Sequence, residues 1–174
     1  MQTTQIAGNW GSELCHYAMP DLSTPVHTPR VSVIMPIRDH RGLALDSVSS
    51  WVNAQTCVPE LFEVIVILDE TVTQLENSLR SLLRQHDRLL TVSTPNEMKQ
   101  YDIGARQASG EYLFFSEPHC LAAPTTVVEI MTYFKTQPFD GFCAKSLPIC
   151  RNRIAALEYR MFEEGWQIWS QEGH

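Results

Sequence analysis

Short apolar runs alternate with segments of helical periodicity along most of this chain. Apolar runs rich in β-branched side chains predict buried strands, whereas apolar residues at every third or fourth position predict amphipathic helices. By these criteria we expect strands at Val31–Ile37, Phe62–Leu68, Arg88–Ser93, Tyr112–Phe115 and Phe139–Ser146. Helices are expected at Leu43–Ala54, Val72–Gln85, Glu97–Ser109, Thr125–Thr136 and Arg153–Trp169.

Prolines and glycines mark the ends of several of these elements. Pro36 cannot donate a hydrogen bond to a sheet ladder, so we expect the first strand to end near it. Gly110 follows the third helix and predicts a left-handed C-cap there. Residues 1–29 are rich in Thr, Ser and Pro and have no clear period, so we expect an irregular leader before one folded domain at residues 30–174.

The alternation of strands and helices predicts an α/β fold, in which helices flank a mostly parallel central sheet. Ligands of such sheets bind outside the carboxyl ends of the strands. Three polar patches fall at those positions, namely Arg38-Asp39, Asp69-Glu70 and Glu117-Pro118-His119. The chain has neither G-x-G-x-x-G nor a Walker pattern, which argues against a dehydrogenase or a kinase.

Composition and charge narrow the class of protein. The 174 residues suffice for one domain with its own core, and the 44% hydrophobic fraction argues against disorder. The formal net charge of −7 argues against nucleic acid as a partner, because phosphate contacts along a duplex need a positive field. A small phosphorylated ligand needs only a local cluster of donors and is not excluded.

The cysteines and the hydropathy indicate the cellular compartment. The five cysteines are odd in number and include no C-x-x-C pair, so reduced thiols in a cytoplasmic protein are the simplest interpretation. No run approaches the ~20 apolar residues of a membrane helix, and Met1 to Asn9 lacks the pattern of a signal peptide. We therefore expect a cytoplasmic protein, either free or held at the inner face of a membrane through a longer parent chain.

Glu117 and His119 are candidate metal ligands, since they flank Pro118 directly after the fourth expected strand. A carboxylate oxygen and an imidazole nitrogen can both bind Mn²⁺ or Mg²⁺, and a cation there would bridge the phosphates of a nucleotide. A capping glutamate and a solvated histidine explain the same residues. From the spacing alone, this second interpretation is favoured.

Asp39 and Asp69 follow the first two expected strands. A carboxylate at either place could accept a hydrogen bond from the imide of a uracil or from ribose hydroxyls. Helix capping and turn formation are the alternative roles, and both are common for aspartate. Arg38 and Arg41 could hold phosphate through their guanidinium forks, or could belong to a solvated loop.

Five segments resemble, in the same order, motifs of the family 2 glycosyltransferases. Val31-Ser-Val-Ile-Met-Pro-Ile-Arg-Asp39 resembles the opening strand, V-S-V-I-I-P-x-x-N. Ser50-Trp51 with Gln55 resembles S-(L/V/I)-x-x-Q, and Glu63–Asp69 resembles E-(I/V)-I-V-V-D-D. Gly104–Leu113 resembles A-R-N-x-G-x-x-x-A-x-G-E-Y-(I/L) with a shortened middle. Phe115-Ser116-Glu117-Pro118-His119 stands where the family has its metal and diphosphate motif, F-L-D-x-D.

This resemblance implies a GT-A fold, a Rossmann-type sandwich, with a nucleotide-diphosphate sugar as donor and Mn²⁺ or Mg²⁺ as cofactor. It favours a UDP-sugar and implies transfer of a hexose by direct displacement at the anomeric carbon. Glu117 and His119 would hold the cation in place of the D-x-D carboxylates. The implied nucleotide-sugar site comprises Pro36, Arg38, Asp39, Asp69, Arg106 and Glu117.

The segment after the metal motif bears on how much of such an enzyme is present. In the family, a carboxylate base typically lies many tens of residues beyond that motif, and here Leu121 to His174 follows. Glu163-Glu164 lies in an expected helix and fits a solvated face, so we assign no catalytic residue. We expect a donor-binding domain that is truncated at its C-terminus, and its acceptor is unidentified.

Two other functions remain open. A catalytically incomplete module that binds a nucleotide sugar or a partner protein without turnover fits the altered metal motif and the missing base. A different α/β nucleotide enzyme, such as a nucleotidyltransferase, fits the basic residue after the first strand but not the lack of a Gly-rich loop. A domain without part of its sheet would expose an edge strand, so assembly into a homo-oligomer is a further hypothesis.

Overall fold

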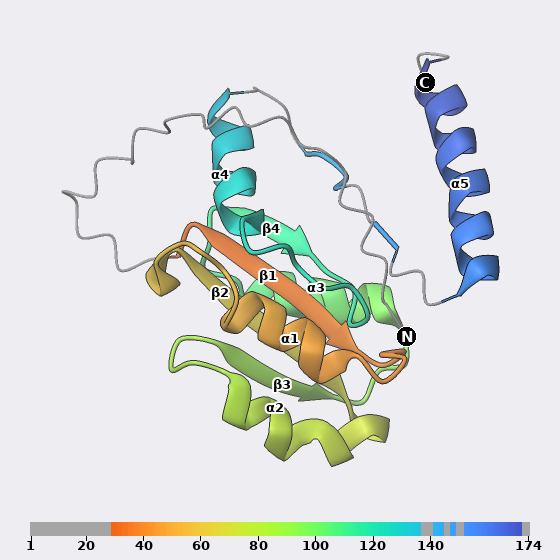
Figure 1. The fold of residues 1–174 in the computed structure, drawn as a ribbon. Coiled ribbons are helices and arrows are strands. Elements are labelled where there is room, and N and C mark those ends of the chain that lie inside the picture. Colours follow the sequence, from red (N-terminus) through yellow and green to blue (C-terminus); the bar gives the residue numbers. More distant parts are fainter. Residues whose placement is uncertain (1–28, 137–140, 145–146, 149–151, 172–174) are drawn as a thin grey trace.

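The centre of the molecule is a parallel β-sheet (Figure 1). The computed structural model describes residues 29–136, 141–144, 147–148 and 152–171. Within them, the strand order is β3-β2-β1-β4, and every neighbouring pair is parallel. The strands are β1 (Val31–Ile37), β2 (Phe62–Asp69), β3 (Arg88–Val92) and β4 (Tyr112–Phe115). Their bounds lie within one residue of the prediction, and the expected α/β fold is confirmed.

The helices follow the expected order, with two changes, since the 3₁₀ turn at Pro59–Leu61 was not expected and one expected helix is divided. The segment expected as one helix at Val72–Gln85 consists of a 3₁₀ segment up to Leu75, whose backbone is kinked at Val72 (φ −121°, ψ 29°), and a short α-helix that ends at Leu82. The helices are α1 (Ala44–Val52), η1 (Pro59–Leu61), η2 (Glu70–Leu75), α2 (Glu76–Leu82), α3 (Glu97–Gln107), α4 (Thr126–Thr136) and α5 (Arg153–Gln171).

Two further expectations concern segments that the structure describes only in part. The strand expected at Phe139–Ser146 is wrong for residues 141–144, which have no regular secondary structure. The rest of that range lies outside the described residues, as do residues 1–28 of the expected leader.

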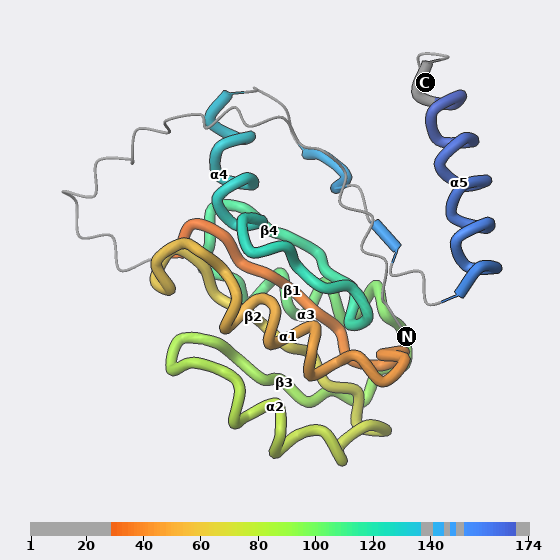
Figure 2. The backbone as a smooth tube through the Cα atoms, viewed as in Figure 1, coloured from red at the N-terminus to blue at the C-terminus, as the bar shows by residue number. Residues whose placement is uncertain are grey.

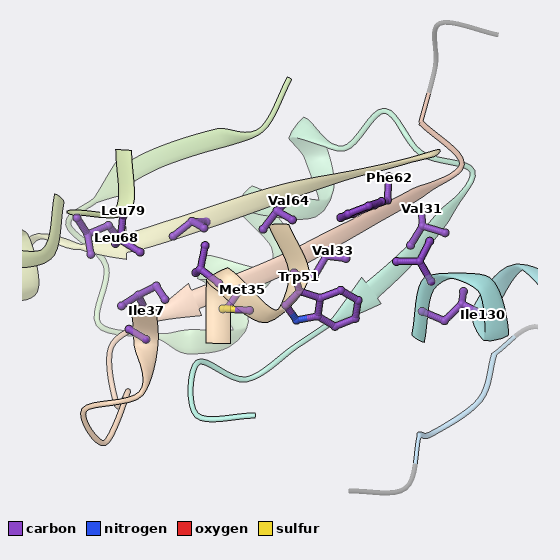
Figure 3. Close-up of a cluster of buried hydrophobic side chains, with 14 residues drawn as sticks. Val31, Val33, Met35, Ile37, Trp51, Phe62, Val64, Leu68, Leu79 and Ile130 are labelled. Carbon is purple, nitrogen blue, oxygen red and sulfur yellow. The ribbon is translucent and has the colours of Figure 1, made fainter. Parts of the chain in front are cut away.

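One face of the sheet packs against α1, α2 and α4. Alternate side chains of β1 and β2 point to this face, among them the fully buried Val33, Met35 and Val64 (Figure 3). Trp51 of α1 joins them and packs against Phe114 of β4, with ring centroids 5.1 Å apart. The two central strands are buried along their whole length, which explains why both are continuous apolar runs in the sequence.

The opposite face packs against α3. Gly104 of this helix lies so close to the sheet that a Cβ there would come within 2.4 Å of Ile34 Cγ2 and 2.7 Å of Ile67 Cδ1. The helix packs mainly on β1 and β2 and reaches β4 through Tyr101, whose ring meets that of Phe115 edge-on with centroids 5.4 Å apart. Leu113 and Phe115 of β4, which pair in register with residues of β1 on this face, remain 43% and 53% exposed.

Gly110 does not form the expected left-handed C-cap. The cap residue of α3 is Ala108, in an extended conformation, and the described residues with positive φ are Arg41 and Gly42. Gly110 instead allows a close approach to β1, because a Cβ there would lie 2.7 Å from the Ser32 backbone nitrogen. Its own N–H donates to Ser32 Oγ at 2.8 Å. The need for glycine is therefore steric rather than conformational.

A buried carboxylate, Glu63, ties together the amino ends of the strands. Its Oε1 accepts from Ser32 Oγ at 2.7 Å and from the Ser109 backbone N–H at 2.6 Å. Arg88 approaches its other oxygen at 3.7 Å. An open hollow of about 440 Å³ lies beside this group, but it is at the opposite end of the sheet from the polar patches that the sequence singles out.

The amphipathic helix α5 lies apart from the sandwich in Figures 1 and 2. Several of its large apolar side chains, including Ile154, Met161 and Phe162, are mostly exposed to solvent. Among the helices that the structure describes, none combines the length and the apolar character needed to cross a bilayer.

Candidate functional site

The topology directs attention to the carboxyl edge of the sheet between β1 and β4. The chain proceeds from β1 to β2 and β3 on one side, whereas β4 joins β1 on the other side. Such a switch of direction leaves a crevice at the carboxyl ends of the two strands, where ligands of open α/β sheets bind. All three polar patches of the sequence follow the carboxyl ends of β1, β2 and β4.

Pro36 lies where β1 has already lost its pairing with β4. The Ile34 carbonyl accepts a hydrogen bond from Ser116 N–H at 2.9 Å, immediately after β4 ends. Pro36 lies two residues further along β1 and faces the same side, where no β4 residue pairs with it. The missing N–H of proline therefore costs no ladder hydrogen bond, and β1 ends one residue later at Ile37.

Asp69, at the end of β2, is buried and held from several sides. Its Oδ1 accepts from Thr71 Oγ1 at 2.6 Å and from Thr71 N–H at 2.9 Å, and its Oδ2 accepts from Gln100 Nε2 at 3.1 Å. The hydrogen bonds from Thr71 are the main cause that lowers the pKa of this carboxyl, with Arg38 and Gln100 adding to the effect. Asp69 thus caps η2, the alternative role that the sequence left open.

Arg38 and Asp39 leave β1 on the exposed side of the same edge. The Arg38 guanidinium donates to the Pro95 carbonyl, beyond the end of β3, so this side chain spans the end of β2. Asp39 forms an exposed ion pair with Arg41 at 3.6 Å. Exposed charges on both residues are accessible to a ligand at this edge.

A tight turn carries Glu117 and His119. The Cys120 N–H donates to the Glu117 carbonyl at 3.1 Å, which closes a β-turn with Pro118 at its second position, where proline is favoured. Ser47 of α1 donates to the Cys120 carbonyl at 2.7 Å. The turn is therefore fixed both by its own backbone and by the neighbouring helix.

The turn brings three possible ligand atoms together. His119 Nε2 lies 3.0 Å from Glu117 Oε2, and Cys120 Sγ lies 3.8 Å from the same oxygen. One donor atom from each side chain lies within 4.8 Å of the others. The sequence predicted the first two residues but missed Cys120, although its position directly after His119 was a signal that could have included it.

The electrostatics of this cluster follow from partial burial and from the Glu117 carboxylate. Burial raises the pKa of the Cys120 thiol, and the nearby Glu117 carboxylate raises it further. Tyr101, which donates from its hydroxyl to the Ser116 carbonyl at 3.1 Å, has its pKa raised to about 12, mainly by burial and also by Glu97 and Glu117. The neutral forms of both groups are thus favoured at neutral pH.

Arg106 is not brought to this edge. It lies in the last turn of α3, is exposed, and pairs with Asp102 at 3.0 Å. The adjoining residue, Gln107, accepts from Arg88 at the first position of β3 (2.6 Å), so this end of α3 lies near the amino ends of the strands. The structure therefore brings together Pro36, Arg38, Asp39, Asp69, Glu117 and His119, but leaves Arg106 at the opposite end of the sheet.

Comparison with protein families decides the relationship that the motifs suggested. The chain matches Glycosyl transferase family 2 over residues 32–163, which includes the described sheet except for Val31, the first residue of β1. It belongs to this family. The expectation drawn from the ordered motifs is thus confirmed, and the divergent segment Glu117-Pro118-His119 lies inside the matched range of a family 2 chain.

Solved structures support the same fold. The family 2 chain is similar to residues 1–349 of TarS from S. aureus, with a TM-score of 0.53 and 18% identity, over 68% of this chain and 38% of that one. The same TarS segment solved in complex with UDP gives a TM-score of 0.52 and 19% identity, with the same coverage of both chains. The expected GT-A-like arrangement is confirmed. Among curated proteins, none matches this chain.

The family 2 chain thus spans less than half the length of the TarS segment that it resembles. The range matched by the family, residues 32–163, contains the carboxyl-edge cluster of Glu117, His119 and Cys120.

The hydrogen bonds around Asp69 predict how the stability of this family 2 domain depends on pH. Since the folded-state pKa is lowered, ionised Asp69 stabilises the fold fully above its unfolded-state pKa of about 4, and this contribution is lost as pH falls toward the folded value. Asp69→Asn should therefore flatten the loss of stability below pH ~4, measured by urea unfolding at successive pH values. Thr71→Val should reduce this loss of stability partly. If both variants lost as much stability below pH ~4 as the wild type does, the loss could not be assigned to Asp69.

Proposed function

We propose that this chain binds a nucleoside diphosphate sugar, with UDP as the nucleotide, and a divalent cation at the carboxyl edge of its sheet, as the donor half of a glycosyltransferase. The carrying observation is the turn after β4, which holds Glu117 Oε2 and His119 Nε2 3.0 Å apart at the carboxyl edge of the sheet, where the strand order changes direction between β1 and β4. Family membership and the similarity to a TarS segment that binds UDP support the proposal.

The residues at this edge have distinct roles in the proposal. Asp69 is buried and rigidly held at the end of β2, so its carboxylate offers a fixed acceptor for the base or ribose of the nucleoside. Pro36 lines the same edge. Arg38 and Asp39 are exposed, and Arg38 would exchange the Pro95 carbonyl for a phosphate oxygen, a better partner for its guanidinium.

The donor atoms of Glu117 and His119 fit a divalent cation. Carboxylate and imidazole are both ordinary ligands of Mn²⁺. The imidazole suits Mg²⁺ less well, because Mg²⁺ prefers oxygen ligands. A cation bound there supplies positive charge that neutralises a diphosphate leaving group. The chain's own part is to hold both ligands on a closed turn, so that little rearrangement is needed on binding.

A donor-binding module without turnover is the second candidate. Among the described residues after the β4 turn, no further carboxylate joins the Glu117–His119–Cys120 cluster. Glu163 of α5, for example, accepts from Tyr159 of the same helix at 3.1 Å. This observation favours binding over complete catalysis by the residues that the structure describes.

Two further hypotheses concern self-association and cellular location. The exposed Leu113 and Phe115 of the edge strand β4 offer an apolar surface for a second copy, so self-association remains a hypothesis. A cytoplasmic location remains the expectation, in line with the free thiols of Cys57, Cys120 and Cys143. The acceptor is unassigned.

Calorimetric titration of UDP with and without Mn²⁺ tests the donor site. We expect Mn²⁺ to strengthen binding, and Glu117→Ala or His119→Ala to weaken the Mn²⁺-dependent binding by at least about tenfold, ~1.4 kcal/mol. Glu129→Ala, on the exposed side of α4, serves as the matched control and should leave binding unchanged. Equal UDP binding in both variants and the wild type would remove the cation assignment.

Turnover separates the two candidate functions. Consumption of a UDP-sugar that requires Glu117 indicates a glycosyltransferase, or a donor hydrolase when no acceptor is present. Mn²⁺-dependent UDP binding without any consumption of donor, over a panel of sugars and acceptors, indicates the binding module.

A further inference from the structure

The third member of the ligand cluster, Cys120, changes the chemistry of the site. Its Sγ lies 3.8 Å from Glu117 Oε2, the same oxygen that His119 Nε2 approaches to 3.0 Å. The side chain is neither on the outside of the turn nor deep in the core, since Cys120 and His119 are both partly buried. A cation that touches Glu117 and His119 would therefore lie within reach of a thiolate.

We propose that Glu117, His119 and Cys120 form a three-ligand site selective for a borderline-soft divalent cation such as Zn²⁺ over Mg²⁺. This inference rests on the proposed function in that it assigns the metal of the same site. It goes beyond that function because a thiolate ligand is not part of the D-x-D motif that this segment replaces.

The spacing of the donor atoms fits such a site. Zinc ligands stand about 2.0–2.2 Å (N, O) and 2.3 Å (S) from the ion, so tetrahedral neighbours are separated by roughly 3.3–3.7 Å. The two separations to Glu117 Oε2, 3.0 and 3.8 Å, bracket this range, and all three atoms lie within 4.8 Å. Small side-chain rotations would suffice to place the three atoms around one ion.

The ligand types decide the selectivity. Mg²⁺ requires near-octahedral oxygen coordination and loses its water reluctantly, and this cluster offers one carboxylate among its three side chains. Imidazole and thiolate favour Zn²⁺ and its neighbours, with the thiol proton released to solvent on binding. Three protein ligands also leave a position for another oxygen, as in zinc sites that act on substrates.

The turn supports the three ligands in a common arrangement. Its backbone hydrogen bond joins Cys120 N–H to the Glu117 carbonyl, so the backbones of the two outer ligands are fixed relative to one another. Ser47 holds the Cys120 carbonyl at 2.7 Å and thereby fixes the backbone of the thiol residue to α1. The site thus depends on contacts within one short segment and one helix.

Titration with Co²⁺ tests the assignment on the full chain, kept reduced with a phosphine reductant. Co²⁺ takes the place of Zn²⁺, and a thiolate ligand produces a charge-transfer absorption band in the near ultraviolet. We expect one equivalent of Co²⁺ to give this band, Zn²⁺ to abolish it, and a large excess of Mg²⁺ to leave it unchanged. Absence of the band in the wild type would overturn the proposal.

Three variants locate the thiolate. Cys120→Ser should abolish the band and lower Zn²⁺ affinity by at least about tenfold. His119→Ala should also lower Zn²⁺ affinity, whereas Cys143→Ser, an exposed cysteine outside the cluster, should leave both readouts unchanged. Retention of the band in Cys120→Ser would assign the thiolate elsewhere and overturn the proposal. Circular dichroism of each variant establishes that the fold is intact.

The Co²⁺ titration and the UDP titration can succeed or fail independently of one another. A thiolate–Co²⁺ band without nucleotide binding would uphold the metal site and remove the proposed function. Mn²⁺-dependent UDP binding that is unaffected by Cys120→Ser, in a protein without the band, would uphold the donor site and overturn the thiolate ligand.

Discussion

Gly110→Ala is expected to lower the free energy of unfolding by about 3 kcal/mol, near the upper end of the cost of overpacking. The added Cβ would meet Ser32 N at 2.7 Å and the Val31 carbonyl carbon at 2.8 Å. Both are backbone atoms of the central strand β1, so neither can rotate away as a side chain would. The strand or the connection to β4 must shift, and the 2.8 Å hydrogen bond from Gly110 to Ser32 would be strained with it.

Urea unfolding followed by tryptophan fluorescence measures this loss, and Gly165→Ala is the matched control. Gly165 lies within α5, where an added Cβ would meet no heavy atom within 4 Å. Alanine there should be neutral, or should stabilise the helix by up to about 1 kcal/mol. Similar stability of Gly110→Ala and the wild type would contradict the steric explanation for this glycine.

Glu63→Ala is expected to destabilise the protein by a similar amount, about 3 kcal/mol, because it leaves buried hydrogen-bond donors without an acceptor. Glu63 is 2% exposed, and Ser32 Oγ and the Ser109 N–H both donate to its Oε1. The Arg88 guanidinium at 3.7 Å contributes less, since its side chain is 39% exposed and is screened by solvent.

Glu111→Ala provides a matched comparison at the same end of the sheet. Glu111 pairs with Arg30 at 2.6 Å, a shorter contact than that of Glu63 with Arg88, but the two side chains are 54% and 40% exposed, so solvent screens the pair. Its removal should cost less than about 1 kcal/mol. Equal losses for the two glutamates in chemical unfolding would show that ion pairing, rather than burial of the acceptor, determines the stability here.

The strands could be predicted from the sequence because β1 and β2 are buried on both faces. A strand enclosed in this way needs apolar residues at every position, so its length is visible as an uninterrupted run. The polar residues directly after each run then mark the carboxyl edge without further information. Asp39 and Asp69 were located in this manner, although the capping of η2 by Asp69 became clear only from its contact with Thr71.

Other features depend on contacts between distant segments, which the local pattern does not contain. Gly110 follows a helix, and this position suggested a cap, but the requirement for glycine comes from Ser32, 78 residues earlier. Arg106 lies in a matching motif, yet α3 carries it back toward the amino ends of the strands. The direction of the helix between two parallel strands was a signal that could have placed this residue.

The turn at Glu117–Cys120 also has a kinetic consequence. Because its backbone is already fixed by the Cys120–Glu117 and Ser47–Cys120 hydrogen bonds, a ligand need only order side-chain rotamers, at about 0.5–1.5 kcal/mol each. Ordering a loose loop would add about 1–2 kcal/mol for every backbone residue. Capture of an ion should therefore proceed in a single fast phase, limited by the exchange of its own water molecules rather than by closure of the chain.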